Sequence, residues 1–350
     1  MFSNRGSGKY QAVAMGGGTT ESERAVALGL QWIAEHQLPN GAWCFNHQLA
    51  SSCRGECNNP GKFDKAFNGA TGLALLPFLG AGVTHINEGK YKTNVYNGLN
   101  YLCRNGKTTK DGCVSYLENG GTIYSHGIAA LCLTEAYGMT KDKRILPAAQ
   151  GSLNYICFHQ DPNGGGWRYQ PHQEGDASAT GWQVSAIKTG YMSGLEVPKD
   201  VIRKASQFLD SVQTESGAKY GYTEPGAGPS TTSVGLLSRM YLGWKHDNPN
   251  LQRGVEWLSK IGPSKSDSYY NYYATQTMFN YNGSLWKKWN VVMREQMIKS
   301  QSQQGHTKGS WHHNGPWTER GGRLYDTALS IMVLETYYRY PSVYKSKTDD

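Results

Sequence analysis

The chain has 350 residues, of which 38% are hydrophobic and 18% are charged, with 43 Gly and 13 Pro. This composition is too apolar and too aromatic for a disordered chain and too mixed for a fibrous one, so it indicates a globular protein of one large domain or two smaller ones. Lys and Arg exceed Asp and Glu by 35 − 27 = +8. That modest excess does not demand a nucleic-acid partner, and we expect none.

The first 23 residues carry scattered glycines and no apolar core of a signal peptide, so we expect a flexible lead-in over 1–23. The longest apolar run, Ala70 to Val83, is interrupted by Pro77 and falls short of the roughly 18 residues that a membrane helix needs. We expect no membrane span, while peripheral membrane contact stays open. The sequence does not fix the compartment. We expect the protein to be exported or envelope-tethered if the chain belongs to a longer protein, and cytoplasmic otherwise.

All seven cysteines lie within the first 157 residues, and the odd count leaves at least one thiol unpaired in a monomer. Three alternatives stay open at this point. Local disulfides could form in an oxidising compartment, between Cys53 and Cys57 and across the loop from Cys103 to Cys113. The thiols could be inert, or a structural zinc ion could bind soft and borderline ligands. The candidate zinc ligands fall within fourteen residues and are Cys44, His47, Cys53 and Cys57.

An internal repeat runs along the chain. Its first half is an amphipathic helix with a Gln near its end, then a polar turn, then Gly and an aromatic residue. Four copies of this half are visible, at 31–45, 153–169, 208–222 and 297–311. The second half is an apolar helix rich in small residues, and its six copies begin at Ala70, Ser125, Ala179, Thr232, Tyr272 and Asp326.

Glycine recurs in one register of these apolar helices, at Gly72, Gly127, Gly181 and Gly235, with separations of 55, 54 and 54 residues. Because Gly costs about 1 kcal/mol against Ala inside a helix, this register indicates close helix packing. Six two-helix units can bury their apolar helices by closing into a ring. We therefore predict an all-α fold, an (α/α)6 toroid over 24–343 with a tail at 344–350. An open solenoid is the alternative.

The spacing of Gln, Gly and Trp from Gln37 to Trp43 and from Gln160 to Trp167 resembles the QW motif of squalene and oxidosqualene cyclases. It is similar, more loosely, to the repeat of protein prenyltransferase beta subunits. The likeness spans about 24–343 and is greatest to a bacterial group of prenyltransferase and squalene oxidase repeat proteins. It implies a toroid with a central cavity and a small hydrophobic or isoprenoid ligand, with no cofactor.

The catalytic motifs of these families are incomplete here. Triterpene cyclases protonate an alkene with an Asp-x-Asp-Asp-Thr segment, and the matching segment, 176–180, keeps only Asp176 and Thr180. We therefore do not expect ordinary squalene cyclisation. Zinc prenyltransferases use an Asp-x-Cys pair and a distant His, but Cys113 and His126 fall within one repeat unit.

The N-terminal ends of the inner helices should meet at one mouth of the toroid, where free backbone N–H groups favour polar or anionic ligands. The candidates for acid or base catalysis are Asp176 and His126. The candidates for lining the cavity are Tyr124, Thr180, Trp182, Tyr272, Tyr325 and Asp326. A purely structural interpretation also stands, in which the two aspartates cap helices and His126 is a satisfied core residue.

The leading hypothesis is a cyclase-like protein that holds an isoprenoid or another lipid, as a non-standard cyclase or transferase. One alternative is a noncatalytic lipid- or protein-binding module of a larger envelope protein. Another is a carbohydrate-active α/α-barrel enzyme, which needs a carboxylate pair drawn from Glu174, Asp176, Glu319 and Asp326. An enzyme requires Asp176 to face the cavity, whereas a binding module permits a filled centre.

Overall fold

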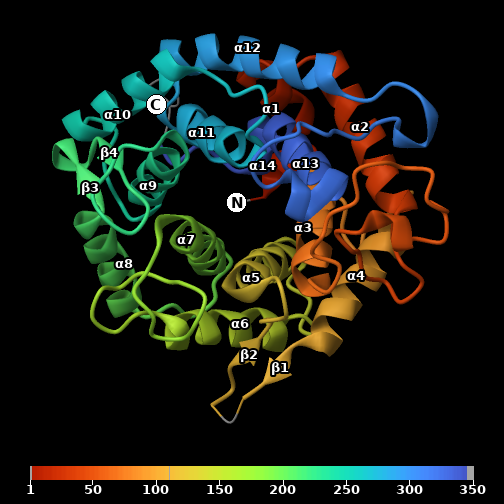
Figure 1. Ribbon diagram of the computed structural model, residues 1–350, viewed down its shortest axis with the longest axis horizontal. Helices are drawn as coiled ribbons and strands as arrows, with labels where there is room; N and C mark the ends of the chain where they lie inside the picture. The colour runs from red at the N-terminus through yellow and green to blue at the C-terminus, as the bar shows by residue number, and fades with distance from the viewer. Residues whose placement is uncertain (1, 110, 345–350) are drawn as a thin grey trace.

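Two concentric rings of helices form the protein (Figure 1), in a computed structural model that describes residues 2–109 and 111–344. The inner ring consists of α3 (Phe67–Gly80), α5 (Thr122–Thr140), α7 (Ala177–Met192), α9 (Pro229–Tyr241), α11 (Ser268–Tyr281) and α13 (Thr318–Leu334). The outer ring consists of α2 (Thr20–Glu35), α4 (Lys92–Asn105), α6 (Leu146–His159), α8 (Lys199–Ser211), α10 (Pro249–Ile261) and α12 (Gly283–Ser300).

The ring is closed. Each inner helix packs against the next one in the chain, and α13 packs against α3. The inner helices are buried on almost every side, whereas an outer helix such as α8 buries only a stripe that includes Val201, Ala205 and Phe208. This difference matches the all-apolar and amphipathic patterns of the two repeat halves. The predicted (α/α)6 toroid is confirmed, and the open solenoid is excluded.

The glycine register lies where inner helices approach each other or their loops. A Cβ on Gly72 would lie 3.1 Å from the backbone of Ala129 on the neighbouring helix α5. A Cβ on Gly235 would lie 2.3 Å from the ring of Tyr220. Both positions have no room for a larger side chain, which is the packing requirement that the repeat spacing predicts.

The Gln and Trp of the repeat tie three helices together. In the third unit, the Gln160 side-chain amide donates to the Gly165 carbonyl (2.8 Å) and to the Val201 carbonyl of the next outer helix (3.0 Å). The Trp167 indole donates to the Ile156 carbonyl (2.8 Å). The same contacts recur at Gln37, Trp43, Gln301 and Trp311. The motif that suggested a family resemblance is therefore a structural linkage.

Two short hairpins replace the Trp turn in the second and fourth units. In the first, β1 (Lys107–Thr108) pairs antiparallel with β2 (Val114–Ser115); in the second, β3 (Gln213–Thr214) pairs with β4 (Lys219–Tyr220). A Tyr follows or ends each hairpin, Tyr116 and Tyr220, and both rings are fully buried. The remaining short helical turns are η2 (His47–Leu49), η3 (Glu215–Gly217) and η4 (Gly305–Thr307).

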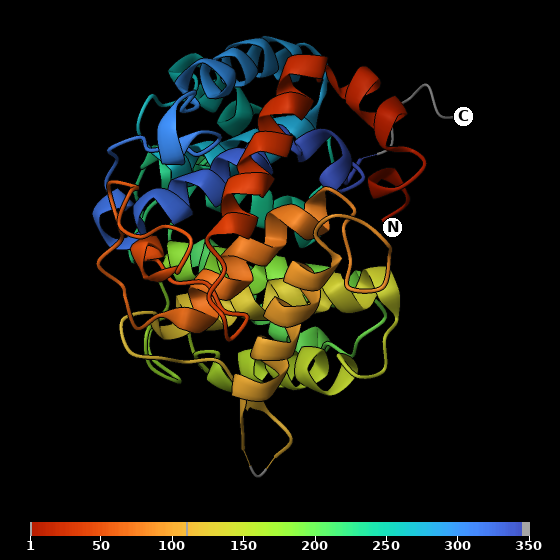
Figure 2. The same ribbon diagram turned by 90° about the vertical axis from the view of Figure 1, so that its right-hand side faces the viewer.

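The N-terminal segment contains helical turns within the range 1–23, where we expected a flexible lead-in. It forms η1 (Ser3–Arg5) and α1 (Lys9–Gly16), which pack against the short C-terminal helix α14 (Thr336–Arg339). Figure 2 shows α1 at one face of the ring. The segment is held because Arg5 is 3% exposed and pairs with a buried carboxylate. The predicted tail lies outside the described residues from position 345 onward.

In the part of the chain that the structure describes, the helices are too short or too polar for any of them to cross a bilayer.

Candidate functional site

Aromatic side chains fill much of the ring centre. Trp182 of α7 stacks on Tyr272 of α11, with ring centroids 5.5 Å apart and planes at 16°. Tyr273 lies against both rings, and Tyr269 lies 4.8 Å from Tyr273. All four side chains are buried, and the Tyr269 hydroxyl donates to the Ser178 carbonyl (3.2 Å) near the N-terminal end of α7. These four side chains therefore pack against one another between the N-terminal halves of α7 and α11.

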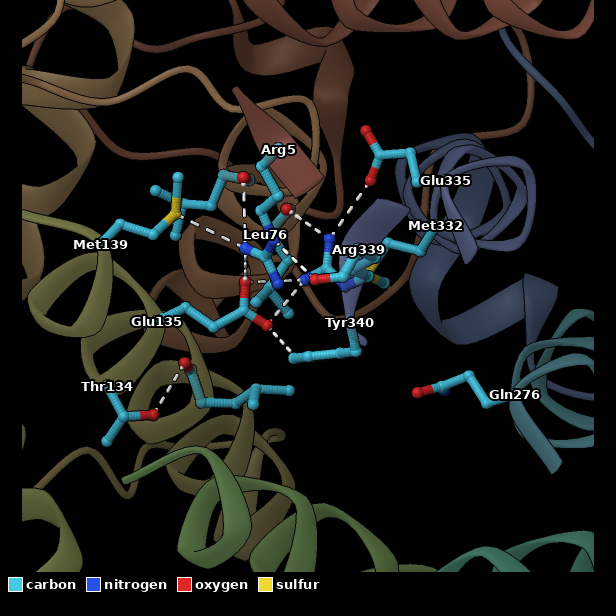
Figure 3. Close-up of polar contacts among 12 residues, drawn as sticks. Arg5, Leu76, Thr134, Glu135, Met139, Gln276, Met332, Glu335, Arg339 and Tyr340 are labelled. Carbon is cyan, nitrogen blue, oxygen red and sulfur yellow. Dashed lines mark hydrogen bonds and ion pairs between the residues drawn. The ribbon is translucent and has the colours of Figure 1, made fainter. Parts of the chain in front are cut away.

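A buried ionic cluster closes the other face of the ring (Figure 3). Glu135 of α5 accepts from Arg5 (2.8 Å) and from Arg339 (2.9 Å), and Arg339 also pairs with Glu335 (3.2 Å). The Tyr340 hydroxyl donates to Glu135 as well. Both chain ends thus meet at the C-terminal ends of the inner helices.

The two carboxyl groups of this cluster differ in their pKa. Burial by itself raises the pKa of Glu135, but the charges of Arg339 and Arg5 outweigh burial and the net pKa is lowered. Burial raises the pKa of Glu335 to about 8, because its share of the Arg339 charge does not offset the loss of water. The surroundings therefore favour the ionised form of Glu135 and the protonated form of Glu335.

A cavity of about 140 Å³ lies beside this cluster, between the C-terminal halves of α7 and α9, the middle of α11 and the segment after α14. Its lining residues are Ser185, Lys188, Thr189, Met192, Tyr241, Tyr272, Gln276, Tyr340, Pro341, Ser342 and Val343. Figure 3 shows Gln276 across from Tyr340, with the two side chains on different elements. The cavity is therefore formed by three inner helices and covered by the C-terminal segment.

Lys188 is the one basic side chain in the cavity lining. Burial lowers its pKa, because the charged ammonium loses water. Within residues 2–109 and 111–344, no acidic side chain pairs with it. The surrounding Met192, Tyr241 and Tyr272 present apolar surface. The site thus combines a single partly buried cation with a small apolar space.

The two predicted catalytic residues lie elsewhere and make structural contacts. Asp176 caps α7 by accepting the Ala179 amide (2.7 Å); burial raises its pKa, and its second oxygen lies 3.8 Å from Arg168. His126 is fully buried and accepts the Tyr116 amide at Nδ1 (3.1 Å), with Nε2 3.1 Å from the Ser152 carbonyl. Burial lowers the pKa of His126 to about 3, so the ring is neutral. Neither residue lines the cavity, and their catalytic roles stay predictions.

The predicted ligand-binding residues fall into two groups, those at the cavity and those away from it. Tyr272 lines the cavity, and Trp182 stacks on it. The Thr180 hydroxyl accepts the Trp167 amide (3.2 Å), and the buried Asp326, inside α13, accepts from the Ser268 hydroxyl (2.7 Å) and the His313 amide (3.0 Å). The remaining two are partly exposed tyrosines: the Tyr124 ring centroid lies 6.3 Å from that of Tyr169, and the buried Tyr325 hydroxyl has no partner among the described residues.

His126 occupies the position that Thr holds in other units. In five of the six units, the backbone N–H of an aromatic residue in the turn donates to a side chain near the start of the following inner helix. The acceptors are Thr71, Thr180, Thr232 and Thr327 in four units and His126 in the second. This recurrence accounts for a histidine at the start of an inner helix without any chemistry.

The predicted zinc ligands are partly brought together. Cys53 and Cys57 lie near one another, together with His36 and His306. Cys44 and His47 are outside this group: the Cys44 thiol donates to the Asp64 carbonyl (3.4 Å), and both nitrogens of the buried His47 ring lack partners among the described residues. Burial lowers the pKa of His36 to about 4 and raises that of Cys57 to about 11. No disulfide joins any of the seven cysteines, all of which lie in the described part of the chain.

Comparisons with known proteins find similarity in structure and none in sequence. No protein-family model matches the chain, and no curated protein matches it. An α-1,6-mannanase from Salegentibacter sp. HEL1_6, an inactive variant in complex with α-1,6-mannotriose, has a TM-score of 0.61 at 9% identity, over 91% of this chain and 99% of that chain.

Two further solved structures are similar to the same extent. Type II terpene cyclase MstE from Scytonema, a variant bound to its product merosterolic acid A, has a TM-score of 0.59 at 14% identity, over 91% of this chain and 97% of that chain. An α-amylase from Clostridium perfringens has a TM-score of 0.59 at 11% identity, over 90% and 97%. At these identities the likeness shows the α/α toroid, and function must be argued from the site.

Sequence reasoning missed the cavity because it looked to the wrong end of the inner helices. Lys188, Gln276 and Tyr241 lie in the C-terminal halves or the middle of their helices. One signal was available: Lys188 is a charged residue within the otherwise uncharged helix at 177–192. A charge on a helix that should be buried all round marks a polar site in the ring interior.

Proposed function

We propose that the protein binds a small amphiphile in the cavity beside α7, with its apolar part against Met192, Tyr241 and Tyr272 and an anionic end at Lys188. The observation that carries this proposal is the partly buried Lys188 in a cavity that supplies no carboxylate. A partly buried ammonium without a counter-charge gains the most from a ligand that brings one. An isoprenoid with a phosphate or carboxylate end meets both requirements.

The size of the cavity limits the ligand. A cavity of about 150 Å³ is known to admit a benzene-sized molecule, and the one here is about 140 Å³. A short prenyl chain fits such a space, whereas a C30 chain such as squalene would have to displace the covering segment Tyr340–Val343. We therefore propose a ligand with one or two isoprene units inside, or a longer one that extends past that segment.

Binding is a better match to this geometry than cyclisation. Asp176 and Lys188 lie twelve residues apart on or next to α7, which is about 18 Å along a helix that rises 1.5 Å per residue. An acid at that distance cannot protonate an alkene held beside Lys188. The proposal is thus the binding-module form of our hypothesis, and a cyclase or transferase activity is left as an outcome of the test.

The carbohydrate alternative has less support. Hydrolysis needs two carboxyl groups about 5–10 Å apart that are free to act on the sugar. Asp326 is engaged by Ser268 and Thr318, and the exposed Glu319 pairs with Lys62. The structural likeness to a mannanase bound to α-1,6-mannotriose nevertheless makes that sugar a suitable ligand to include in the test.

Calorimetric titration tests the proposal with three matched ligands, geranyl diphosphate, geraniol and inorganic diphosphate, and with α-1,6-mannotriose as a fourth ligand for the carbohydrate alternative. We expect geranyl diphosphate to bind best. Lys188→Gln should weaken its binding about 10- to 100-fold, as expected for losing a charged hydrogen bond of about 1.5–3 kcal/mol, and should leave geraniol binding nearly unchanged. The control is Lys260→Gln, at an exposed lysine of the outer helix α10.

Each other outcome contradicts a named part of the proposal. Equal loss in both lysine variants would place the anion outside the cavity. Binding of α-1,6-mannotriose alone would favour the carbohydrate alternative. A new product in extracts of the geranyl diphosphate incubation would replace binding with turnover.

A further inference from the structure

Two cysteines and two histidines from distant parts of the chain meet at the seam between the first and sixth units. Cys53 and Cys57 lie in the loop between α2 and α3, and His36 ends α2. His306 lies in η4, between α12 and α13. One ligand atom from each residue lies within 4.8 Å of all the others.

The separations are close to those around a tetrahedral ion, although not equal to them. Cys57 Sγ lies 3.4 Å from His36 Nε2 and 3.1 Å from His306 Nδ1. With Zn–S bonds of about 2.3 Å and Zn–N bonds of about 2.0 Å, adjacent ligand atoms of a tetrahedral site lie about 3.3–3.8 Å apart. The four side chains therefore need only small movements to bind one ion in common.

The hydrogen bonds of His36 prepare it as a ligand. Its Nδ1 lies 2.7 Å from the Trp32 carbonyl, an oxygen that can only accept, so Nδ1 carries the proton. In the neutral ring, Nε2 then has a free lone pair, and Nε2 is the atom that faces Cys57. A carbonyl that fixes the tautomer of a histidine in this way is the usual outer contact of a zinc ligand.

We propose that His36, Cys53, Cys57 and His306 bind a structural zinc ion that joins the first unit to the last. On binding, the two thiols release their protons to solvent, and the two thiolates balance the charge of Zn²⁺ while both imidazoles stay neutral. The four protein ligands leave no open coordination position, which is typical of a structural site and not of a catalytic one. Two thiolates and two imidazoles in a tetrahedral arrangement favour zinc over magnesium or calcium.

The position of the site gives the ion a defined role. His306 is 249 residues from Cys57 in the chain, and only the closure of the ring brings the two together. A cross-link over so long a stretch of chain restricts the unfolded state strongly, as a disulfide would. Zinc at this seam therefore stabilises ring closure.

A disulfide between Cys53 and Cys57 is the competing arrangement, and it does not account for the histidines. It would use two of the four side chains and would leave the lone pair of His36 Nε2 facing a sulfur with no proton to donate. It would also form no link to η4, where His306 lies. The zinc site uses all four groups.

Metal analysis of the purified protein tests the proposal, using the full chain from cells grown with added zinc salt. We expect close to one zinc ion per chain by plasma mass spectrometry, and visible absorption of a tetrahedral thiolate site after exchange with Co²⁺. Cys57→Ala and His306→Ala should lose the ion. His306→Cys should keep it, because a thiolate can replace an imidazole in a tetrahedral zinc site.

Cys44→Ala is the matched control, since Cys44 is a buried cysteine of the same loop outside the cluster. It should keep the ion. If Cys57→Ala does not fold, the zinc contents of His306→Ala and His306→Cys test the proposal instead. The His306 side chain is partly exposed, so its substitution should disturb the fold less. Zinc content that is equal in wild type and His306→Ala would overturn the proposal. The proposal would also be overturned if the native protein contained no zinc and its intact mass showed a disulfide.

Discussion

The hydroxyl of Thr180 provides a sharp test of how the repeat is held together. It accepts the backbone N–H of Trp167 at 3.2 Å, and both residues are fully buried. Thr180→Val keeps the shape of the side chain and removes the acceptor. The Trp167 N–H then has no partner and no water, which costs about 1–3 kcal/mol.

This cost should appear as a fall in the free energy of unfolding, measured by guanidinium denaturation followed by tryptophan fluorescence. The range corresponds to roughly a 5- to 150-fold change in the unfolding equilibrium. Thr71→Val and Thr327→Val should give the same range, because those hydroxyls accept the Trp43 and Trp311 amides at 3.0 Å.

Thr134→Val is the control for this experiment. Thr134 is also fully buried on an inner helix, but its hydroxyl donates to the Leu131 carbonyl of its own helix (3.0 Å). Its removal leaves no unpaired N–H, so we expect a loss below about 1 kcal/mol. If Thr180→Val destabilises the protein no more than Thr134→Val does, the acceptor role of the Thr position is refuted.

Three further substitutions probe the packing and the ionic cluster. Gly235→Ala places a Cβ 2.3 Å from the Tyr220 ring and should cost about 1–3 kcal/mol of overpacking; an unchanged denaturation midpoint would contradict this. Arg339→Leu leaves Glu135 with one of its two guanidinium partners and should cost about 3–5 kcal/mol by the same assay. Glu335 has its pKa raised from 4.5 to about 8, so its contribution to stability is complete below pH 4.5 and is lost as the pH rises through 8. The wild-type Tm should fall more between pH 6 and pH 9 than that of Glu335→Gln, and equal falls would argue against a buried protonated Glu335.

The sequence predicts the fold well because the determining signals are local and repeated. An inner helix needs to be apolar all round, and its glycines must recur where neighbours approach, so Gly72 and Gly235 could be interpreted without coordinates. Closure of the ring does not follow from the repeat alone, because an open solenoid could stack the same units; the contact of α13 with α3 decides it. Local signals say less about the N-terminal segment, because Arg5 pairs there with Glu135, a residue far along the chain.

The site is less predictable because its contacts are not local. Cys53 and Cys57 are a recognisable pair in the sequence, but their expected companions in the same loop, Cys44 and His47, lie outside the cluster. In the structure, His36 and His306 lie beside the two cysteines instead. His306 belongs to the last unit, which meets the first unit only where the ring closes. A spacing rule derived from short zinc motifs cannot find a ligand separated by 249 residues.

Ring closure also brings polar groups from the two ends of the chain together at one seam. The toroid has six interfaces between inner helices. Five of them join helices of consecutive units, whereas the interface between α13 and α3 joins the last unit to the first. On the loop face, backbone N–H groups of Lys62 and Phe63 donate to carbonyls of Glu319 and Arg320 (3.0 Å each).

On the opposite face of the same seam, Arg339 donates to the Leu76 carbonyl at the end of α3 (2.7 Å) and pairs with Glu135 of α5. The zinc ligands reinforce the loop face and the Arg5 cluster reinforces the terminal face. Other interfaces between inner helices also carry hydrogen bonds, such as Gln183 to the Ile123 carbonyl (3.1 Å) and Thr277 to the Ser233 carbonyl (3.0 Å), but the contacts at this seam join residues from the two ends of the chain. Those contacts specify which two helices meet, which a uniform apolar surface does not.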